Sequence, residues 1–249
     1  MTRVAMPDAT KQRTGIVERT AAHKTLQEIG DDMHRRGIFT GGPPEQFELL
    51  GRMQFAMMVR EGIYPWSKVL DIGCGCLRGG FWMIHFLDRA GYFGIEPNTD
   101  MVAAGIKEII GQDAIEEKCP TIDSNDQFDA SVFGARFDAF LARSIWTHAS
   151  KPQIRTMLDH FVNLGTENAF FLASYLPAKF PWQDYRGDEY RGKSHKSNIG
   201  DLVCHSFKWI EGECQKRRLF IRELPDGILL GQKWLKISKK PIAENAYRM

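Results

Sequence analysis

The stretch VLDIGCGCLRGG, residues 69–80, decides which fold this chain is expected to adopt. A short apolar run leads into Asp71, and glycines follow at positions 73, 75, 79 and 80. Such a run is typical of a buried strand, and glycine permits the tight turns that bring a backbone close to a ligand. We therefore predict a strand that leads through a ligand-binding loop into a helix, as in open α/β folds.

The spacing of the glycines separates this loop from two common phosphate-binding loops. Positions 73, 75 and 79 give G-x-G-x-x-x-G, one residue longer than the dinucleotide fingerprint, which disfavours a nicotinamide-dependent oxidoreductase. No G-K-[ST] ending follows, which excludes a P-loop. A second strand is predicted at YFGIEP, residues 92–97, and its acid Glu96 could accept hydrogen bonds from both hydroxyls of a ribose.

The rest of the chain alternates between strand and helix patterns. Further strands are predicted near 120–123, 137–144 and 169–176. Helices are predicted at 79–90, 98–111 and 151–165, with a last helix through Ile199 and Cys214 and a closing hairpin of 218–224 and 228–237. This alternation predicts a mostly parallel sheet with helices on both faces.

Two helices precede this domain, one over 20–36 and one that begins at Glu45, and a Met-rich stripe on the second favours packing in the core. We expect them to cover one face of the sheet. The predicted organisation is a mobile tail, a helical segment, the main domain and a C-terminal tail, at residues 1–18, 19–64, 65–240 and 241–249.

Composition narrows the class of protein. The 43% hydrophobic and 26% charged residues are usual for a soluble globular chain, and a net charge of +2 gives no strong attraction to nucleic acid. No apolar run is long enough to span a membrane, and the N-terminus lacks the apolar core of a secretory signal. Five cysteines without framework spacing favour a reducing, cytoplasmic location. Cys74 and Cys76 have no partners at zinc spacing, so no metal site is predicted.

The block VLDIGCGCLRGG…YFGIEPN resembles motif I and the following acidic strand of the class I S-adenosylmethionine (SAM)-dependent methyltransferases. The resemblance extends loosely over residues 66–238. LRGG, together with RSIWTH at 143–148, is similar to a bacterial branch often linked to methylation of sugars, polysaccharides or small metabolites. The resemblance implies a Rossmann-like fold whose seven-stranded, mostly parallel sheet ends in an antiparallel hairpin, and it implies SAM as the cofactor.

The resemblance also implies which residues hold the cofactor. Asp71 would meet its ammonium, Glu96 its ribose and Arg78 its carboxylate, although Arg78 could equally be an exposed arginine at a helix start. Asp126 and Phe128 of NDQF would contact the adenine, the alternative being an ordinary turn. The full expected set is Asp71, Gly73, Cys74, Gly75, Arg78, Glu96, Pro97, Asn98, Asp126, Phe128 and Arg143.

Methyl transfer to a hydroxyl needs alignment, exclusion of water and removal of a proton. His148 follows the fourth predicted strand and titrates near neutrality, so it is the candidate general base; the alternative is a histidine that caps the next helix. The aromatic and basic stretch after 176 is expected to face the acceptor, or else to be a solvated loop. The candidate acceptor residues are Trp146, Tyr175, Trp182, Tyr185, His195 and His205.

We therefore predict a methyltransferase that acts on a hydroxyl of a small molecule or sugar, in glycan or natural-product biosynthesis, and that needs no metal. An RNA methyltransferase and a non-catalytic SAM-binding protein remain the alternatives. No membrane partner is expected and nucleic acid is disfavoured. The oligomeric state stays open, with a homodimer among the options.

Overall fold

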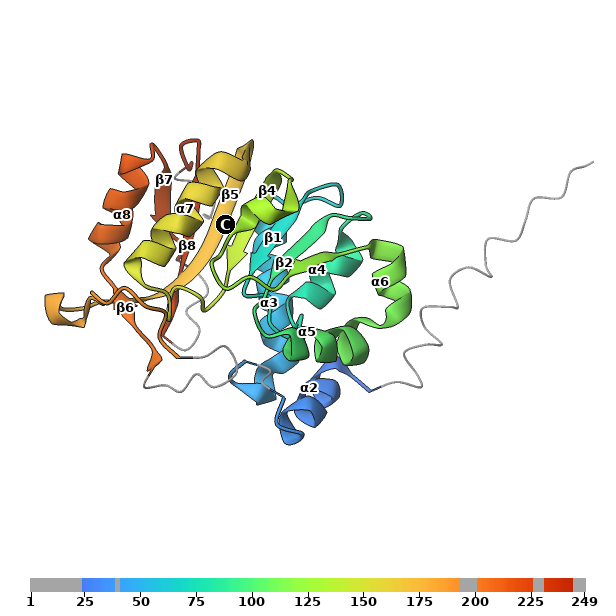
Figure 1. Cartoon of the computed structure of the whole chain (residues 1–249). Coiled ribbons are helices and arrows are strands. Elements are labelled where there is room, and N and C mark those ends of the chain that lie inside the picture. The colour runs from blue at the N-terminus through green and yellow to red at the C-terminus, as the bar shows by residue number, and fades with distance from the viewer. Residues whose placement is uncertain (1–23, 39–40, 193–200, 226–230, 244–249) are drawn as a thin grey trace, which may run out of the picture.

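The computed structural model describes residues 24–38, 41–192, 201–225 and 231–243. These residues form one twisted sheet with the strand order β3-β2-β1-β4-β5-β8-β7 (Figure 1). The short strand β6 also pairs with β5 but lies outside this order. The strands are β1 (Val69–Ile72), β2 (Tyr92–Ile95), β3 (Thr121–Asp123), β4 (Phe137–Ala142), β5 (Gly165–Pro177), β6 (Cys204–His205), β7 (Phe220–Glu223) and β8 (Lys233–Ser238).

The pairing within the sheet confirms the predicted class. The β2–β3, β1–β2, β1–β4 and β4–β5 pairs are parallel, and β8 is antiparallel to both β5 and β7. All four residues of β1 and of β2 are buried. That pattern fits central parallel strands, which helices cover on both faces.

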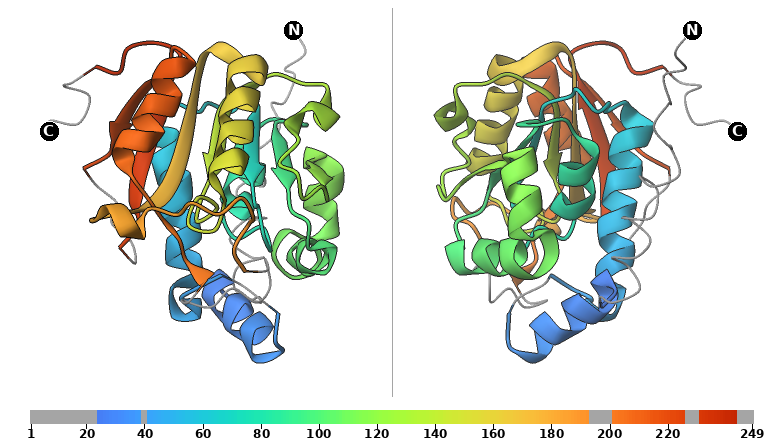
Figure 2. Two further views of the ribbon diagram at one scale, coloured as in Figure 1. Left: turned by 60° about the vertical axis from the view of Figure 1, so that its left-hand side comes forward. Right: turned by 90° about the vertical axis from the view of Figure 1, so that its right-hand side faces the viewer.

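Helices pack on both faces of the sheet, and further helices lie below it (Figure 2). One face carries α7 and α8, and the other carries α3 and α4. The helices are α2 (Leu26–Arg35), α3 (Phe47–Glu61), α4 (Gly80–Phe86), α5 (Thr99–Gly105), α6 (Gln112–Lys118), α7 (Lys151–Leu164) and α8 (Phe207–Lys216), with shorter turns η1 (Pro44–Gln46), η2 (Ile106–Ile110), η3 (Ala130–Phe133) and η4 (Pro181–Gln183).

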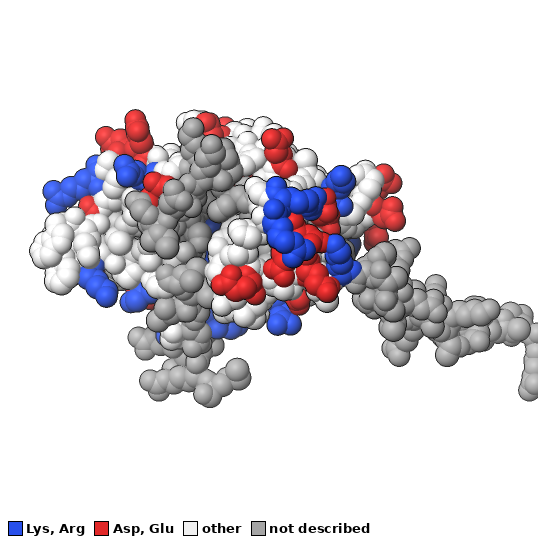
Figure 3. Space-filling model, turned by 90° about the horizontal axis from the view of Figure 1, so that it is seen from below, with Lys and Arg blue, Asp and Glu red and all other residues white. Residues whose placement is uncertain are grey.

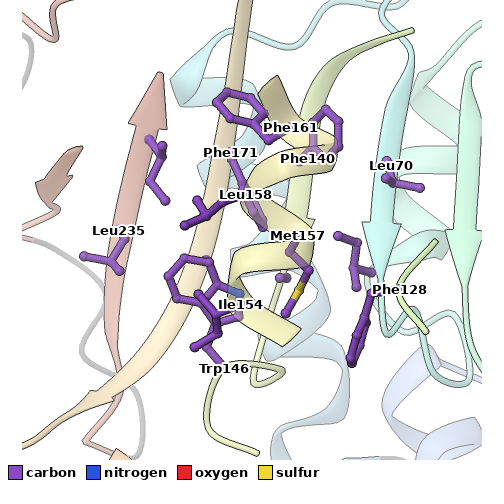
Figure 4. Close-up of a cluster of buried hydrophobic side chains, with 14 of the residues drawn as sticks. Leu70, Phe128, Phe140, Trp146, Ile154, Met157, Leu158, Phe161, Phe171 and Leu235 are labelled. Atoms are coloured by element: carbon purple, nitrogen blue, oxygen red, sulfur yellow. The ribbon is translucent and has the colours of Figure 1, made fainter. Parts of the chain in front are cut away.

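The sheet separates two hydrophobic cores. On the α7 and α8 face, Phe140 and Phe171 pack against Leu158 and Phe161 of α7 (Figure 4). On the other face, residues of β1, β4 and β5 pack with α3 and α4: Val69, Ala139, Leu141, Leu172, Met58 and Met83. The alternation of side chains along each strand sends neighbouring residues to opposite cores.

The two N-terminal helices differ in position, because α3 covers one face of the sheet as expected, whereas α2 lies below it, where the parallel strands end (Figures 1 and 2). α2 begins with a capping box between Thr25 and Glu28, and a Cβ on its Gly30 would lie 2.4 Å from Phe47, so glycine allows α2 to meet the start of α3. Figure 1 shows α2 below the carboxyl edge of the sheet. Met57 and Met58 of α3 are buried, which confirms the expected core role of this helix.

Three segments differ from the prediction. The last helix begins at Phe207 rather than near Ile199, because Cys204 pairs with Leu176 and extends the sheet beyond the expected end of β5. The helix predicted over 98–111 is α5 followed by the π-helical turn η2. α6 was not predicted. Long-range pairing, which local periodicity does not encode, set the first boundary.

Candidate active site

The glycine loop after β1 bends around the end of β2. Gly73 and Gly75 adopt φ angles of +74° and +59°, in the left-handed region that favours glycine. The amides of Gly73 and Cys74 donate to the carbonyl of Ile95 at 2.8 and 3.2 Å. A Cβ on Gly73 would lie 2.1 Å from Cδ1 of Ile145, in the loop after β4. Glycine is therefore required here both for conformation and for close contact.

The carboxylate of Glu96 joins this loop to the segment after β2. Glu96 is 4% exposed. Its Oε2 accepts from the amide of Gly75 at 3.1 Å, and its Oε1 accepts from the amide of Asn98 at 2.9 Å. A carboxylate has about four acceptor positions, and these two hydrogen bonds fix its orientation. The Asn98 side chain accepts from Met101 N and caps α5.

Asp71 is the third residue of β1 and is buried near Glu96. Its Oδ2 accepts a hydrogen bond from the hydroxyl of Tyr92 at 2.8 Å. Burial raises the pKa of Asp71 to about 7; the Tyr92 hydrogen bond opposes this shift and the charge of Glu96 adds to it. A buried carboxyl that titrates near neutrality is well placed to respond to a cation in the site.

The two cysteines of the loop are structural. Cys74 is buried with its Sγ against Gly94, where a Cβ would lie 2.8 Å away. Burial raises the pKa of Cys74, and it raises the pKa of Cys76 to about 11. Both are therefore neutral thiols at physiological pH. Within the described part of the chain, no group of three or more His, Cys, Asp or Glu side chains is placed to hold a metal ion.

Two arginines lie on the loops that follow β1 and β4. Arg78 is 8% exposed, and its Nη1 is buried with no hydrogen-bond partner. Its guanidinium lies over the ring of Phe47 at 5.7 Å. Arg143 directly follows β4, which runs parallel to β1. Burial and the positive charge of Arg78 lower the pKa of Arg143 to about 9, so the two cations are close enough to repel each other.

An aromatic group stands beside these residues. Phe128 is buried at φ +58°, a conformation that non-glycine residues rarely adopt outside functional loops and turns. The ring of Tyr190 lies 6.2 Å from Phe128 and 5.6 Å from His148. Burial raises the pKa of Tyr190, and the charge of Glu96 adds to this shift. Sequence reasoning did not select Tyr190. The available signal was its aromatic type within the stretch already expected to face the acceptor.

His148 connects the loop after β4 with the loop that carries Tyr190. Its Nδ1 lies 3.0 Å from the carbonyl oxygen of Arg191, which can only accept, so Nδ1 carries the proton. In return, the Arg191 amide donates to the His148 carbonyl at 2.8 Å. Burial lowers the pKa of His148, while Arg191 and Asp201 oppose the shift. The imidazole is therefore neutral near pH 7.

A buried polar network occupies the carboxyl ends of β4 and β5 and the start of β8. Ser144, at φ +60°, receives a hydrogen bond at its hydroxyl from Gln232 Nε2 at 2.9 Å. Its amide donates to Ser174 Oγ at 2.7 Å, and Ser174 Oγ donates to Gln232 Oε1 at 2.7 Å. Sequence reasoning did not select these residues, because long-range strand pairing brings them together.

Three of the predicted acceptor residues are fully buried. Tyr175 and Trp146 are fully buried on the α7 and α8 face, and the hydroxyl of Tyr175 donates to Glu223. His205 is also fully buried, with Nε2 3.0 Å from the carbonyl of Ala149. None of the three presents surface to solvent in this structure, and the expectation that they contact an acceptor stays a prediction.

The remaining predicted residues lie nearer the surface. Trp182 is 77% exposed and stacks on Phe180 with ring centroids 4.6 Å apart. Tyr185 is half-buried and donates to the carbonyl of Glu189. Pro97 and Asp126 are exposed, and Asp126 accepts from Gln127 at 2.7 Å. His195 lies outside the described residues, as do the 1–18 tail and most of the C-terminal tail.

This architecture is the class I SAM-dependent methyltransferase fold. The chain is similar to magnesium protoporphyrin IX methyltransferase (ChlM) from Synechocystis PCC 6803 with bound SAM, at 16% identity and a TM-score of 0.58 over 96% of this chain and 100% of that one. It is also similar to DesVI of Streptomyces venezuelae (12%, TM-score 0.57, 88% and 100% covered) and to the DhpI–SAH complex (10%, TM-score 0.55, 87% and 98% covered).

Comparisons of sequence add nothing to this likeness: no protein-family profile and no curated protein matches the chain. At identities of 10 to 16%, the solved structures establish the fold and leave the activity to be argued from the site. Among the described helices, none combines the length and apolar character needed to cross a membrane.

Proposed function

We propose that this protein is a SAM-dependent methyltransferase that acts on a hydroxyl of a small molecule or sugar in glycan or natural-product biosynthesis. The observation that carries the proposal is the buried carboxylate of Glu96, oriented by the amides of Gly75 and Asn98 at the carboxyl edge of the sheet. An acid in this position suits a ribose with free hydroxyls. The neighbouring Phe128 and Tyr190 suit the faces of an adenine ring.

The charges in the site fit the rest of the cofactor. SAM carries an ammonium, a carboxylate and a sulfonium. The buried Asp71 suits the ammonium, and the unpartnered Nη1 of Arg78 suits the carboxylate. An unpaired buried guanidinium nitrogen is costly, so a site with this feature gains when an anion binds. A Cβ on Gly75 would make only an ordinary contact, 3.7 Å from Met101 Cε, so the positive φ rather than crowding favours glycine there.

Bound SAM supplies an activated methyl group on a sulfonium, which leaves as a neutral thioether. The chain must then orient the acceptor, exclude water and take a proton. His148 is neutral at Nε2, so this nitrogen could accept a proton from an acceptor hydroxyl. Tyr190, which stacks on His148, would restrict water from the site.

Two features favour a small molecule or sugar over RNA. Among the described residues that are visible from below, toward the carboxyl edge, Lys and Arg are interleaved with Asp and Glu and form no continuous basic field (Figure 3). The exposed pair of Phe180 and Trp182 offers a flat apolar face of the kind that stacks on sugar rings. An RNA enzyme would use a basic patch to bind phosphates.

Calorimetric titration with SAM, S-adenosylhomocysteine (SAH) and NAD tests the cofactor. We expect one SAM or SAH per chain and no measurable NAD binding; tight NAD binding without SAM binding would refute the proposal. A screen of hydroxylated small molecules and glycans with methyl-labelled SAM, run with and without EDTA, tests the activity. Cofactor binding without turnover on any acceptor would favour a non-catalytic SAM-binding protein. Loss of turnover in EDTA would contradict metal-free catalysis.

A further inference from the structure

Gly79 and Gly80 end the glycine-rich stretch, and the conformation of the backbone does not require glycine at either position. Neither has the positive φ found at Gly73 and Gly75. Gly79 is the N-cap of α4, with helical angles, and Gly80 is the first residue of that helix. Glycine is less favourable than alanine in a helix. The reason for these two glycines must therefore lie in the packing around them.

Two buried polar side chains occupy the space that a larger residue would need. A Cβ on Gly79 would lie 2.7 Å from Oε1 of Gln54, which is buried on α3. A Cβ on Gly80 would lie 2.9 Å from the hydroxyl oxygen of Tyr92, which is buried at the start of β2. The second contact leads to the candidate site, because the Tyr92 hydroxyl donates to Oδ2 of Asp71 at 2.8 Å.

The register of β1 and β2 explains how Tyr92 reaches Asp71. Asp71 is paired with Gly94, and Tyr92 precedes Gly94 by two positions. Side chains two positions apart on a strand share a face, so the Tyr92 and Asp71 side chains lie on the same face of neighbouring strands. Gly94 places no side chain opposite Asp71, which leaves the phenol ring of Tyr92 free to reach the carboxyl group.

The hydrogen bond from Tyr92 holds one carboxyl oxygen of Asp71 and leaves the other for a ligand. Within the residues that the structure describes, Oδ1 of Asp71 accepts no hydrogen bond, whereas Oδ2 accepts from Tyr92. The strands and loops around this carboxyl carry the following titratable or charged groups: Tyr92, Glu96, Cys74, Cys76, Arg78 and Arg143. Burial raises the pKa of Tyr92 and of Cys74, so both are neutral. The charge of Glu96 opposes ionisation of Asp71, and the phenol favours it.

We propose that Tyr92 is a positioning residue whose hydroxyl orients the Asp71 carboxylate toward the cofactor ammonium and stabilises its charge, and that Gly80 provides the space for this hydroxyl. The inference rests on the proposed function, in which Asp71 meets the ammonium. A hydrogen bond to a carboxylate is stronger than one to the neutral acid. The phenol therefore lowers the pH at which Asp71 becomes able to pair with a cation.

Calorimetric titration of Tyr92→Phe with SAH, at about pH 6 and about pH 8.5, is the first test. Loss of the hydrogen bond should raise the pKa of Asp71 by about one unit from its native value of about 7. SAH affinity should then be about tenfold below that of the native protein at pH 6 and within about threefold of it at pH 8.5. The ratio of the two affinities cancels any titration of SAH itself. Tyr64→Phe, at an exposed tyrosine between α3 and β1, is the matched control and should change neither affinity.

The second test needs no ligand. The carbon-13 chemical shift of the Asp71 carboxyl is followed by NMR while the empty protein is titrated, and Asp71→Asn identifies its resonance. The midpoint in Tyr92→Phe should lie about one pH unit above that of the native protein, and the midpoint in Tyr64→Phe should not move.

Gly80→Ala tests the space around the hydroxyl. The added Cβ would meet the Tyr92 hydroxyl oxygen at 2.9 Å and Leu77 at 3.1 Å. Displacement of the hydroxyl should raise the midpoint of Asp71 in the same direction as Tyr92→Phe does. In the double variant the midpoint should equal that of Tyr92→Phe alone, because the hydroxyl is already absent. Gly212→Ala, in α8, is the control, since no neighbour lies within 4 Å of the added Cβ.

Three results would each overturn the inference. The first is an Asp71 midpoint in Tyr92→Phe within about 0.3 pH units of the native value. The second is a loss of SAH affinity by the same factor at both pH values, as a purely structural role would give. The third is an equal shift in Tyr64→Phe. If Tyr92→Phe does not fold, the midpoint in Gly80→Ala decides in its place. Failure of the native protein to bind SAH would instead refute the proposed function, and the carboxyl titration of the empty protein would still judge Tyr92.

Discussion

The pKa of Asp71 predicts that cofactor affinity depends on pH. In the empty protein burial raises this pKa to about 7, so below neutrality the carboxyl is mainly protonated. Pairing with the SAM ammonium needs the ionised form, so binding below pH 7 must release a proton. Affinity should therefore rise about tenfold per pH unit well below pH 7 and level off above it, a gain of about 30-fold between pH 5.5 and 8.

The same shift predicts a stability change of defined sign. Unfolded Asp71 has a pKa of about 3.9, so between about pH 4 and 7 the folded protein holds a proton that the unfolded chain has lost. The free energy of unfolding should fall as pH rises through this window, by up to about 4 kcal/mol. Asp71→Asn, which still accepts from the Tyr92 hydroxyl, should remove this contribution.

Calorimetry measures both the affinity and the proton release. Titrations of SAM at pH 6 in buffers of different ionisation enthalpy should report close to one proton released in the native protein and much less in Asp71→Asn. Any slope that remains in the variant belongs to other groups, His148 among them. A pH-independent affinity in the native protein, or the same slope in both proteins, would refute the reasoning.

Other predictions concern Glu96, two glycines with positive φ, and His148. Glu96→Ala should weaken SAM binding by roughly 1.5–3 kcal/mol through loss of charged hydrogen bonds. Glu108→Ala, at a half-buried carboxylate paired with Arg36, should leave the affinity unchanged. Equal affinities of the native protein and a folded Glu96→Ala protein would remove Glu96 from the site. Gly134→Ala should lower the free energy of unfolding by denaturant by about 1–2 kcal/mol, because φ at Gly134 is positive but the space for a Cβ is open. Gly73→Ala should lower it by more, because the added Cβ would also meet Ile145. A smaller loss of stability at Gly73 than at Gly134 would contradict the packing argument. His148→Ala should lower turnover by about 10²–10⁴-fold with nearly intact SAM affinity. The rate of the native protein should rise with pH through a pKa below the usual histidine value. Equal rates of the native protein and His148→Ala across that pH range would leave His148 a structural role.

Local sequence patterns were sufficient to predict strand β1, the glycine loop that follows it and the position of Glu96 in the candidate site. The apolar run before Asp71 and the glycines at 73 and 75 encode a buried strand and a positive-φ loop through short-range effects, and the structure has both. The position of Glu96 followed from the same logic, since parallel neighbours end at one edge of a sheet. These features depend on residues close in sequence.

Only the tertiary structure decided which side chains face the site. Tyr175 and Ser174 are adjacent in β5, yet Tyr175 enters the core beneath α7 and α8 while Ser174 joins Ser144 and Gln232. A buried strand is apolar on both faces, so its sequence does not tell which face meets the ligand. In the same way, the proximity of Arg78 to Arg143 and of Phe128 to Tyr190 depends on strand order and loop packing across more than 60 positions of the chain. Contacts at that separation are set by how the whole chain fills its two cores, which no local pattern records.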